Sequence, residues 1–154
     1  MKTNVFRILA LLMCVQTHAI AQELSIIPEP AELRRSQGSF TLSSATLIMT
    51  PPRQPEVSRI ASYLAEKLKA STGMTLKTSE TGNQGIALQL NVPADKKLGA
   101  EGYSLDITTG QVLIKANTPA GIFYGIQTLL QLFPDEIESR SPVANVTWQA
   151  PAVS

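Results

Sequence analysis

The segment "ANTPAGIFYGIQTLLQLFP", residues 116–134, decides how the rest of the chain is interpreted. Thr118 is suited to cap a helix, Pro119 to begin it and Pro134 to end it. Large apolar residues recur at helical spacing along one stripe: Ile122, Ile126, Leu129, Leu130 and Phe133. The segment contains no Asp, Glu, Lys, Arg or His. It therefore predicts a helix that fills a core and carries no acid–base chemistry.

Two glycines in this segment, Gly121 and Gly125, lie four residues apart on a neighbouring face of the predicted helix. A glycine inside a helix costs about 1 kcal/mol relative to alanine. We expect close packing to compensate, with the helix backbone approaching a sheet at both positions.

A second helix is predicted over residues 55–70, "PEVSRIASYLAEKLKA". Pro55 fits the first helical position, Lys67 and Lys69 suit the C-terminal end of the helix dipole, and Gly73 is a stop signal. Its apolar residues form one stripe: Val57, Ile60, Ala61, Leu64 and Leu68. This helix is expected to bury one face and to expose the other.

The remaining segments predict strands. Residues 103–108 and 111–116 flank Thr109-Gly110 and predict a tight hairpin, with these side chains facing inward: Tyr103, Leu105, Ile107, Val112, Ile114 and Ala116. Further strands are expected at 24–27, 45–50, 74–78 and 86–92, and a second hairpin at 32–42 with its turn at Gln37-Gly38. In 86–92, Ile86, Leu88, Leu90 and Val92 alternate with smaller or polar residues. Together these elements predict an α+β fold, a mostly antiparallel (mixed) sheet with two helices packed on one face.

Residues 1–21 have the parts of a secretory signal peptide. Lys2 and Arg7 give a positive start, an apolar run follows over 8–15, and residues 19–21 form a small-x-small cleavage site. The apolar run is shorter than the roughly 20 residues that a membrane-spanning helix needs. Lipidation at Cys14 is the alternative, which Met13 disfavours because a small residue is wanted before the lipidated cysteine. We expect a soluble domain exported to the periplasm or beyond.

Cleavage would remove the only cysteine, Cys14, and the only histidine, His18. The remaining chain then has no disulfide, cysteine nucleophile, Ser-His-Asp triad or zinc site built on imidazole or thiolate. Two of the 13 basic residues leave as well, so the net charge with 12 acidic residues becomes −1. No basic patch is visible, so neither nucleic acid nor an anionic membrane surface is expected as a partner.

The strongest acidic cluster consists of Asp135, Glu136 and Glu138. Paired carboxylates can act as general acid and base. This cluster follows a proline-terminated helix, with no partner base suggested, and is interpreted as a solvated loop. The basic pairs Arg34-Arg35 and Lys96-Lys97 are interpreted as surface residues, since neighbouring strand residues point in opposite directions.

Trp148, the single tryptophan, could stack on a sugar ring or anchor a linker, and the anchor is preferred. Four other aromatic residues fall on or beside the core stripes and are interpreted as structural: Tyr63, Tyr103, Phe123 and Tyr124. The loop "TGNQG", residues 81–85, lacks the lysine and helix of a nucleotide-binding loop. No catalytic, cofactor-binding or metal-ligating residue is therefore assigned, and no cofactor is expected.

The order of segments resembles one family over essentially the whole chain after the signal peptide. The resemblance is carried by an "IIPEP" opening, the "GSFTL" strand, the 55–70 helix and "EGYSLDITTGQVLIKANTPAGIFYGIQTLLQL". These segments resemble the N-terminal domain of bacterial β-N-acetylhexosaminidases, glycoside hydrolase family 20. The closing "WQAPAVS" resembles the linker into that family's catalytic barrel. The predicted division is a signal peptide at 1–21, an α+β domain at 22–141 and the start of a linker at 142–154.

The resemblance implies an accessory domain of an enzyme that releases terminal N-acetylhexosamine from glycans. In that family, the sugar-binding arginine, the Asp-Glu pair and the aromatic pocket belong to a following (β/α)8 barrel, and the substrate's acetamido oxygen is the nucleophile. A barrel needs about 250 residues, far more than this chain could supply. None of the family's catalytic residues is therefore assigned to a position in this sequence. We expect no hydrolysis by this chain alone. The implied partner is the barrel, in the same polypeptide or as a separate chain; the alternative is a stand-alone module that binds N-acetylglucosamine-containing glycans.

Overall fold

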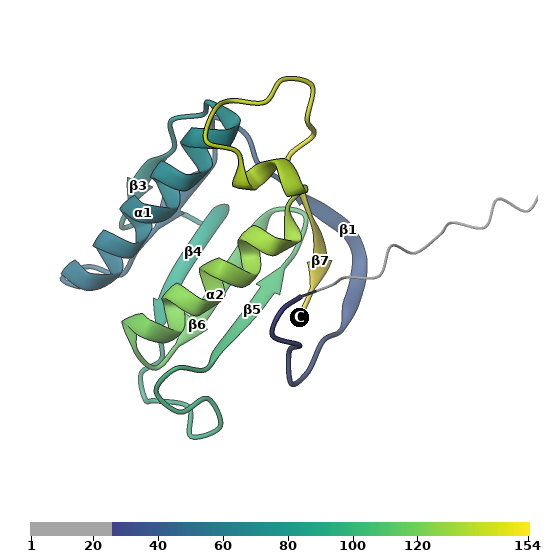
Figure 1. Cartoon of the computed structure of the whole chain (residues 1–154). Coiled ribbons are helices and arrows are strands. Elements are labelled where there is room, and N and C mark those ends of the chain that lie inside the picture. Colours follow the sequence, from purple (N-terminus) through teal and green to yellow (C-terminus); the bar gives the residue numbers. More distant parts are fainter. Residues whose placement is uncertain (1–25) are drawn as a thin grey trace, which may run out of the picture.

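The computed structural model describes residues 26–154, which form two sheets and two α-helices. The strands are β1 (Arg35–Thr41), β2 (Leu47–Met49), β3 (Lys77–Ser79), β4 (Gly85–Leu90), β5 (Tyr103–Ile107), β6 (Gln111–Ala116) and β7 (Gln149–Val153). The helices are α1 (Pro55–Thr72), α2 (Pro119–Leu132) and the 3-10 helix η1 (Asp135–Glu138). Both α-helices cover the same face of the larger sheet (Figure 1). The expected signal peptide at 1–21 lies outside the described residues.

The larger sheet has the order β3-β2-β4-β6-β5 and mixed pairing. The α+β class and the two helices on one face are confirmed, but three of the four strand pairs are parallel, and β5–β6 is antiparallel. The expectation of a mostly antiparallel sheet is therefore wrong for this sheet. The helix α1 crosses over between β2 and β3, a connection that makes the two strands parallel. In β4, the consecutive residues Ile86, Ala87 and Leu88 are all buried, as in strands covered on both faces.

The hairpin predicted around Thr109-Gly110 is formed by β5 and β6. Thr108 donates its backbone N–H to the Gln111 carbonyl at 2.8 Å and closes the turn. In the antiparallel register, Tyr103 lies opposite Ala116 and Ile107 opposite Val112. The predicted inward residues therefore share the face on which the helices pack.

Helix α2 begins and packs as its sequence predicts. Thr118 is the N-cap, and its hydroxyl accepts a hydrogen bond from the Gly121 backbone N–H at 3.4 Å. A Cβ placed on Gly121 would lie 2.5 Å from the Gly102 carbonyl oxygen, and one on Gly125 would lie 2.5 Å from the Ile114 Cγ2 atom. Both glycines thus allow α2 to approach the β5–β6 hairpin and the turn before it.

Helix α1 ends as predicted at Gly73, which has the left-handed conformation that glycine adopts most easily. Its backbone N–H donates to the Lys69 carbonyl at 2.9 Å. The predicted stripe residues Val57, Ala61 and Leu64 are fully buried against the sheet.

The expected hairpin at 32–42 is wrong. Instead, β1 is one strand that pairs antiparallel with β7, with a register shift between Arg35 and Ser39. Gly38 has a φ of +95° within this irregular stretch, so its backbone freedom serves a bulge and not a turn. The partner strand β7 lies within 142–154, the residues predicted to begin a linker. By its pairing and its buried residues Ala150 and Val153, β7 packs as part of this domain.

Two smaller differences concern strand ends. Ile26 and Ile27, the described part of the expected strand at 24–27, lie outside any strand. The strand β4 ends at Leu90, and Val92, the last apolar residue of the alternating pattern, is 93% exposed. The alternating pattern continued beyond Leu90 in sequence, but Pro93 directly after Val92 cannot donate to a strand ladder.

Candidate functional site

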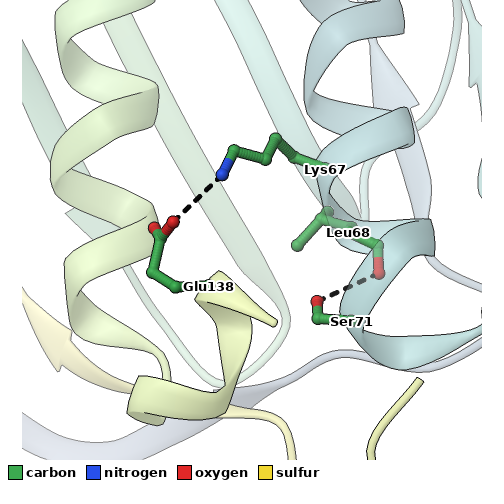
Figure 2. Close-up of polar contacts among 4 residues, drawn as sticks. All are labelled: Lys67, Leu68, Ser71 and Glu138. Carbon is green, nitrogen blue, oxygen red and sulfur yellow. Dashed lines mark hydrogen bonds and ion pairs between the residues drawn. The ribbon is translucent and has the colours of Figure 1, made fainter. Parts of the chain in front are cut away.

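The acidic cluster lies on η1, at the surface. Asp135, Glu136 and Glu138 are exposed, while Ile137 between them is buried and holds the segment on the core. The Lys67 Nζ atom on α1 lies 3.0 Å from a Glu138 carboxylate oxygen (Figure 2). This ion pair ties η1 to α1, so one of the three carboxylates has a structural contact and the other two face solvent.

The two basic pairs also lie at the surface. Arg34 and Glu32 approach to 4.0 Å with side chains 80% and 85% exposed, a contact of little energetic weight. Lys96 and Lys97 are exposed in a turn, where the Lys97 backbone N–H donates to the Asp95 carboxylate at 2.9 Å. These positions agree with their interpretation as surface residues.

Trp148 is buried, with 5% of its surface exposed, and belongs to the main hydrophobic cluster. Its backbone carbonyl accepts a hydrogen bond from the Leu42 N–H at 2.9 Å. The indole ring therefore anchors the segment before β7 to the core of this domain. A sugar ring has no access to its face, so the residue that motivated a glycan-binding module does not supply a binding platform.

The four aromatic residues that the sequence places on or beside the core stripes divide into two groups. The Tyr103 hydroxyl lies 2.6 Å from the Thr128 hydroxyl oxygen, which joins β5 to α2 as a structural contact. Phe123 and Tyr124, in contrast, are 37% and 44% exposed, and the Phe123 ring lies 5.5 Å from the ring of Tyr63 on α1. Both were predicted to lie on or beside the core stripes, and both lie beside the buried stripe with part of their surface exposed. The signal was present in the sequence, since both lie off the apolar stripe that begins at Ile122.

A cavity of about 510 Å³ opens beside β2 and β4, lined in part by the 81–85 loop. Its lining residues include no Asp, Glu, Lys, Arg, His or Cys. Two of its hydroxyls are already committed to the local loop: Thr46 Oγ1 accepts from the Ser43 N–H at 3.0 Å, and Ser43 Oγ accepts from the Ala45 N–H at 3.3 Å. The cavity thus lacks a group for acid–base catalysis.

Within residues 26–154, no three His, Cys, Asp or Glu side chains are grouped so that they could hold a metal ion. The same residues include no helix with the length and apolar character needed to cross a membrane.

Comparison with known proteins identifies the family of this chain. Residues 23–149 match the family model described as glycosyl hydrolase family 20, domain 2. The chain belongs to glycoside hydrolase family 20. Within that family it corresponds to the accessory domain, in enzymes whose catalytic barrel lies in the same chain.

Family 20 relatives support this assignment in sequence and in structure. A β-hexosaminidase of Porphyromonas gingivalis is 37% identical over 131 residues, which are 84% of this chain and 16% of the relative. The β-N-acetylhexosaminidase of Streptomyces coelicolor A3(2) superposes with a TM-score of 0.75 at 34% identity, over 83% of this chain and 25% of that one. A Streptomyces plicatus N-acetyl-β-hexosaminidase gives 0.74 at 34% identity, over 84% and 25%. This chain therefore spans about a sixth to a quarter of the length of these relatives.

Proposed function

We propose that this domain is the non-catalytic support of an exported β-N-acetylhexosaminidase, an enzyme that releases terminal N-acetylhexosamine from glycans. The observation that carries the proposal is the family 20 domain 2 match over residues 23–149. The 37% identical relative from P. gingivalis is named a β-hexosaminidase, and its alignment covers this accessory part.

The support role follows from how the domain is built. Its large apolar residues close a core between two helices and a sheet, with Ile114, Ile122 and Ile126 fully buried. The acidic cluster on η1 is exposed, and one of its carboxylates pairs with Lys67. Such a unit supplies a rigid body against which a larger domain can pack, and leaves the chemistry to that domain.

Export of the protein is part of the proposal and rests on the signal-like residues 1–21, with a positive start, an apolar run and a small-x-small site. Periplasm and exterior are both compatible with it. The barrel is the proposed partner, either in the same polypeptide or in a separate chain that binds this one. The buried position of Trp148 gives the alternative glycan-binding module no support.

The test compares a family 20 barrel with and without this domain, using a chromogenic N-acetylglucosaminide. We expect residues 23–154 alone to hydrolyse nothing, and the barrel to lose thermal stability and activity when this domain is deleted. Hydrolysis by residues 23–154 alone would overturn the proposal. So would a barrel whose stability and activity are unchanged by the deletion.

A further inference from the structure

The cavity beside β2 and β4 is lined entirely by uncharged residues. It is formed by the end of β1, residues 43–47, residues 82–85 and the turn between β5 and β6, segments that lie far apart in the sequence. Its volume of about 510 Å³ falls in the range of pockets that hold small molecules in proteins. Hydroxyl, amide, glycine and apolar residues make up the whole lining.

Three polar side chains at this cavity have no partner in the described part of the chain. Asn83 and Gln84 directly precede β4, Thr109 lies in the hairpin turn, and all three are exposed. None of their side chains makes a hydrogen bond to another described residue, whereas the Thr41 hydroxyl already accepts one from the Gln149 side chain at 3.1 Å. Amides and hydroxyls both donate and accept hydrogen bonds. The three groups therefore suit a ligand that carries donors and acceptors of its own.

The cavity also has an apolar side, which includes Leu47 and the buried Phe40. A Cβ placed on Gly85 would overlap the Leu47 carbonyl oxygen, so glycine lets the loop before β4 approach this side closely. The Gly85 N–H donates to the Gly110 carbonyl at 3.2 Å, which holds that loop beside the hairpin turn. A sugar ring has a matching division, with apolar C–H faces and a polar edge.

The lining excludes other classes of ligand. It contains no Asp, Glu, Lys, Arg or His, so a charged ligand would lose hydration without gaining an ionic partner. A wholly apolar ligand would remove water from the Asn83 and Gln84 amides without replacing their hydrogen bonds.

We infer that this cavity is a sugar-binding site that takes a neutral N-acetylhexosamine unit of a glycan. The inference rests on the proposed function, because that function supplies the sugar: the 37% identical P. gingivalis relative is named a β-hexosaminidase. The acetamido group of such a sugar donates and accepts hydrogen bonds, as the Asn83 and Gln84 amides do, and its methyl group suits the side that includes Leu47. The cavity holds the sugar without cleaving it, since the lining offers no acid or base.

The test follows the cavity residues by NMR in the isotope-labelled protein while N-acetylglucosamine is added. Saturable chemical-shift changes are expected for Asn83, Gln84 and Thr109, with a Kd of about 1–10 mM, as a few neutral hydrogen bonds provide. Trp148 does not line the cavity, so its fluorescence is expected to stay unchanged during the same titration.

The variant that combines Asn83→Ala and Gln84→Ala should weaken binding at least about tenfold. Its Tm should equal that of the wild-type protein, because neither side chain has a hydrogen bond to lose. Gln89→Ala is the matched control, since Gln89 is an exposed amide of β4 outside the cavity, and it should bind as the wild-type protein does. Equal loss of binding in both variants, or loss in neither, would overturn the inference.

A second comparison tests the selection of a neutral sugar. Protonated glucosamine differs from N-acetylglucosamine by the acetyl group that removes the charge of its amine. We expect it to bind at least about tenfold more weakly, because the uncharged lining offers no ionic partner. Equal binding of the two sugars would overturn the inference.

Failure of this inference can be distinguished from failure of the proposed function. If deletion of the whole domain destabilises the barrel while N-acetylglucosamine shifts no signal at the cavity, the support role stands and the cavity is not a sugar site. If deletion leaves the barrel unchanged while the cavity signals shift and saturate, the support role is wrong and the sugar site stands.

Discussion

Substitution of Gly125 by alanine separates packing from helix propensity, because the two effects have opposite signs. Propensity alone favours alanine by about 1 kcal/mol at a position inside a helix. In the structure, an added Cβ would lie 2.5 Å from the Ile114 Cγ2 atom and 3.2 Å from the Tyr103 Cδ2 atom. Ordinary contacts of a Cβ begin at 3.4 Å, so the neighbours must move.

Neither neighbour can move easily. Ile114 is fully buried in β6, and the Tyr103 hydroxyl is held 2.6 Å from the Thr128 hydroxyl. Overpacking of a core costs about 1–3 kcal/mol, and these constraints place Gly125→Ala in the upper half of that range. After the propensity gain, the free energy of unfolding should fall by about 1–2 kcal/mol. For a domain of this size, that lowers Tm by roughly 3–8 °C.

The assay is thermal unfolding followed by circular dichroism. Gly110→Ala is the matched control, since a Cβ at Gly110 meets nothing within 4 Å and its φ is not among the positive values. That variant should keep the wild-type Tm or exceed it slightly. If Gly125→Ala unfolds at or above the wild-type temperature, close packing of α2 on the hairpin does not need a glycine at this position.

Three further experiments test other contacts. Trp148→Ala should lower the free energy of unfolding, measured in urea, by about 3–5 kcal/mol. In the wild-type protein, millimolar chitobiose should leave the tryptophan fluorescence unchanged, and a sugar-dependent change would contradict the buried position of Trp148. A double-mutant cycle on Lys67→Met and Glu138→Gln should give a coupling of no more than about 1 kcal/mol, because both side chains are partly exposed. Gln131→Leu removes both hydrogen bonds between the Gln131 side chain and the Ile27 backbone, of 2.9 and 3.0 Å. Hydrogen exchange at the Ile27 amide should then become faster. An unchanged exchange rate would show that these two hydrogen bonds do not hold the Ile27 segment in place.

Local signals predicted the elements that depend on neighbours in sequence. The cap at Thr118, the stop at Gly73 and the turn at Thr109-Gly110 each act within a few residues, and all three are confirmed. The role of the two glycines in α2 was also predictable. A glycine destabilises a helix interior, so it is expected there only where close packing compensates for that loss of stability.

The elements that local sequence patterns do not predict depend on distant partners. The strand β1 pairs with β7, which lies over 100 residues away, and the glycine signal at Gly38 was equally compatible with a turn or a bulge. The parallel pairing of β4 with β6 is set by the order of crossovers rather than by residue alternation. Trp148 was placed in a linker because its burial depends on Leu42 and the core, which no local pattern shows.

Composition alone limits the chemistry that the sequence predicts, whereas the exposure of the aromatic residues depends on three-dimensional contacts. If residues 1–21 are removed as a signal peptide, which stays a prediction, Cys14 and His18 leave with them, and the chemistries that need a thiol or an imidazole leave too. The helical spacing placed Phe123 and Tyr124 beside the apolar stripe, but only the three-dimensional contact with Tyr63 showed that they form one exposed surface.

The most direct test of the support role is the intact mass of the native polypeptide that contains residues 55–72, together with hexosaminidase activity in the same fraction. An antibody against that helix would isolate it from the source cell. The account predicts a mass several-fold above the 16.6 kDa of this chain, or a stable complex of that size, with activity in the same fraction. A free polypeptide of 16.6 kDa or less, without a bound barrel and without activity, would contradict it.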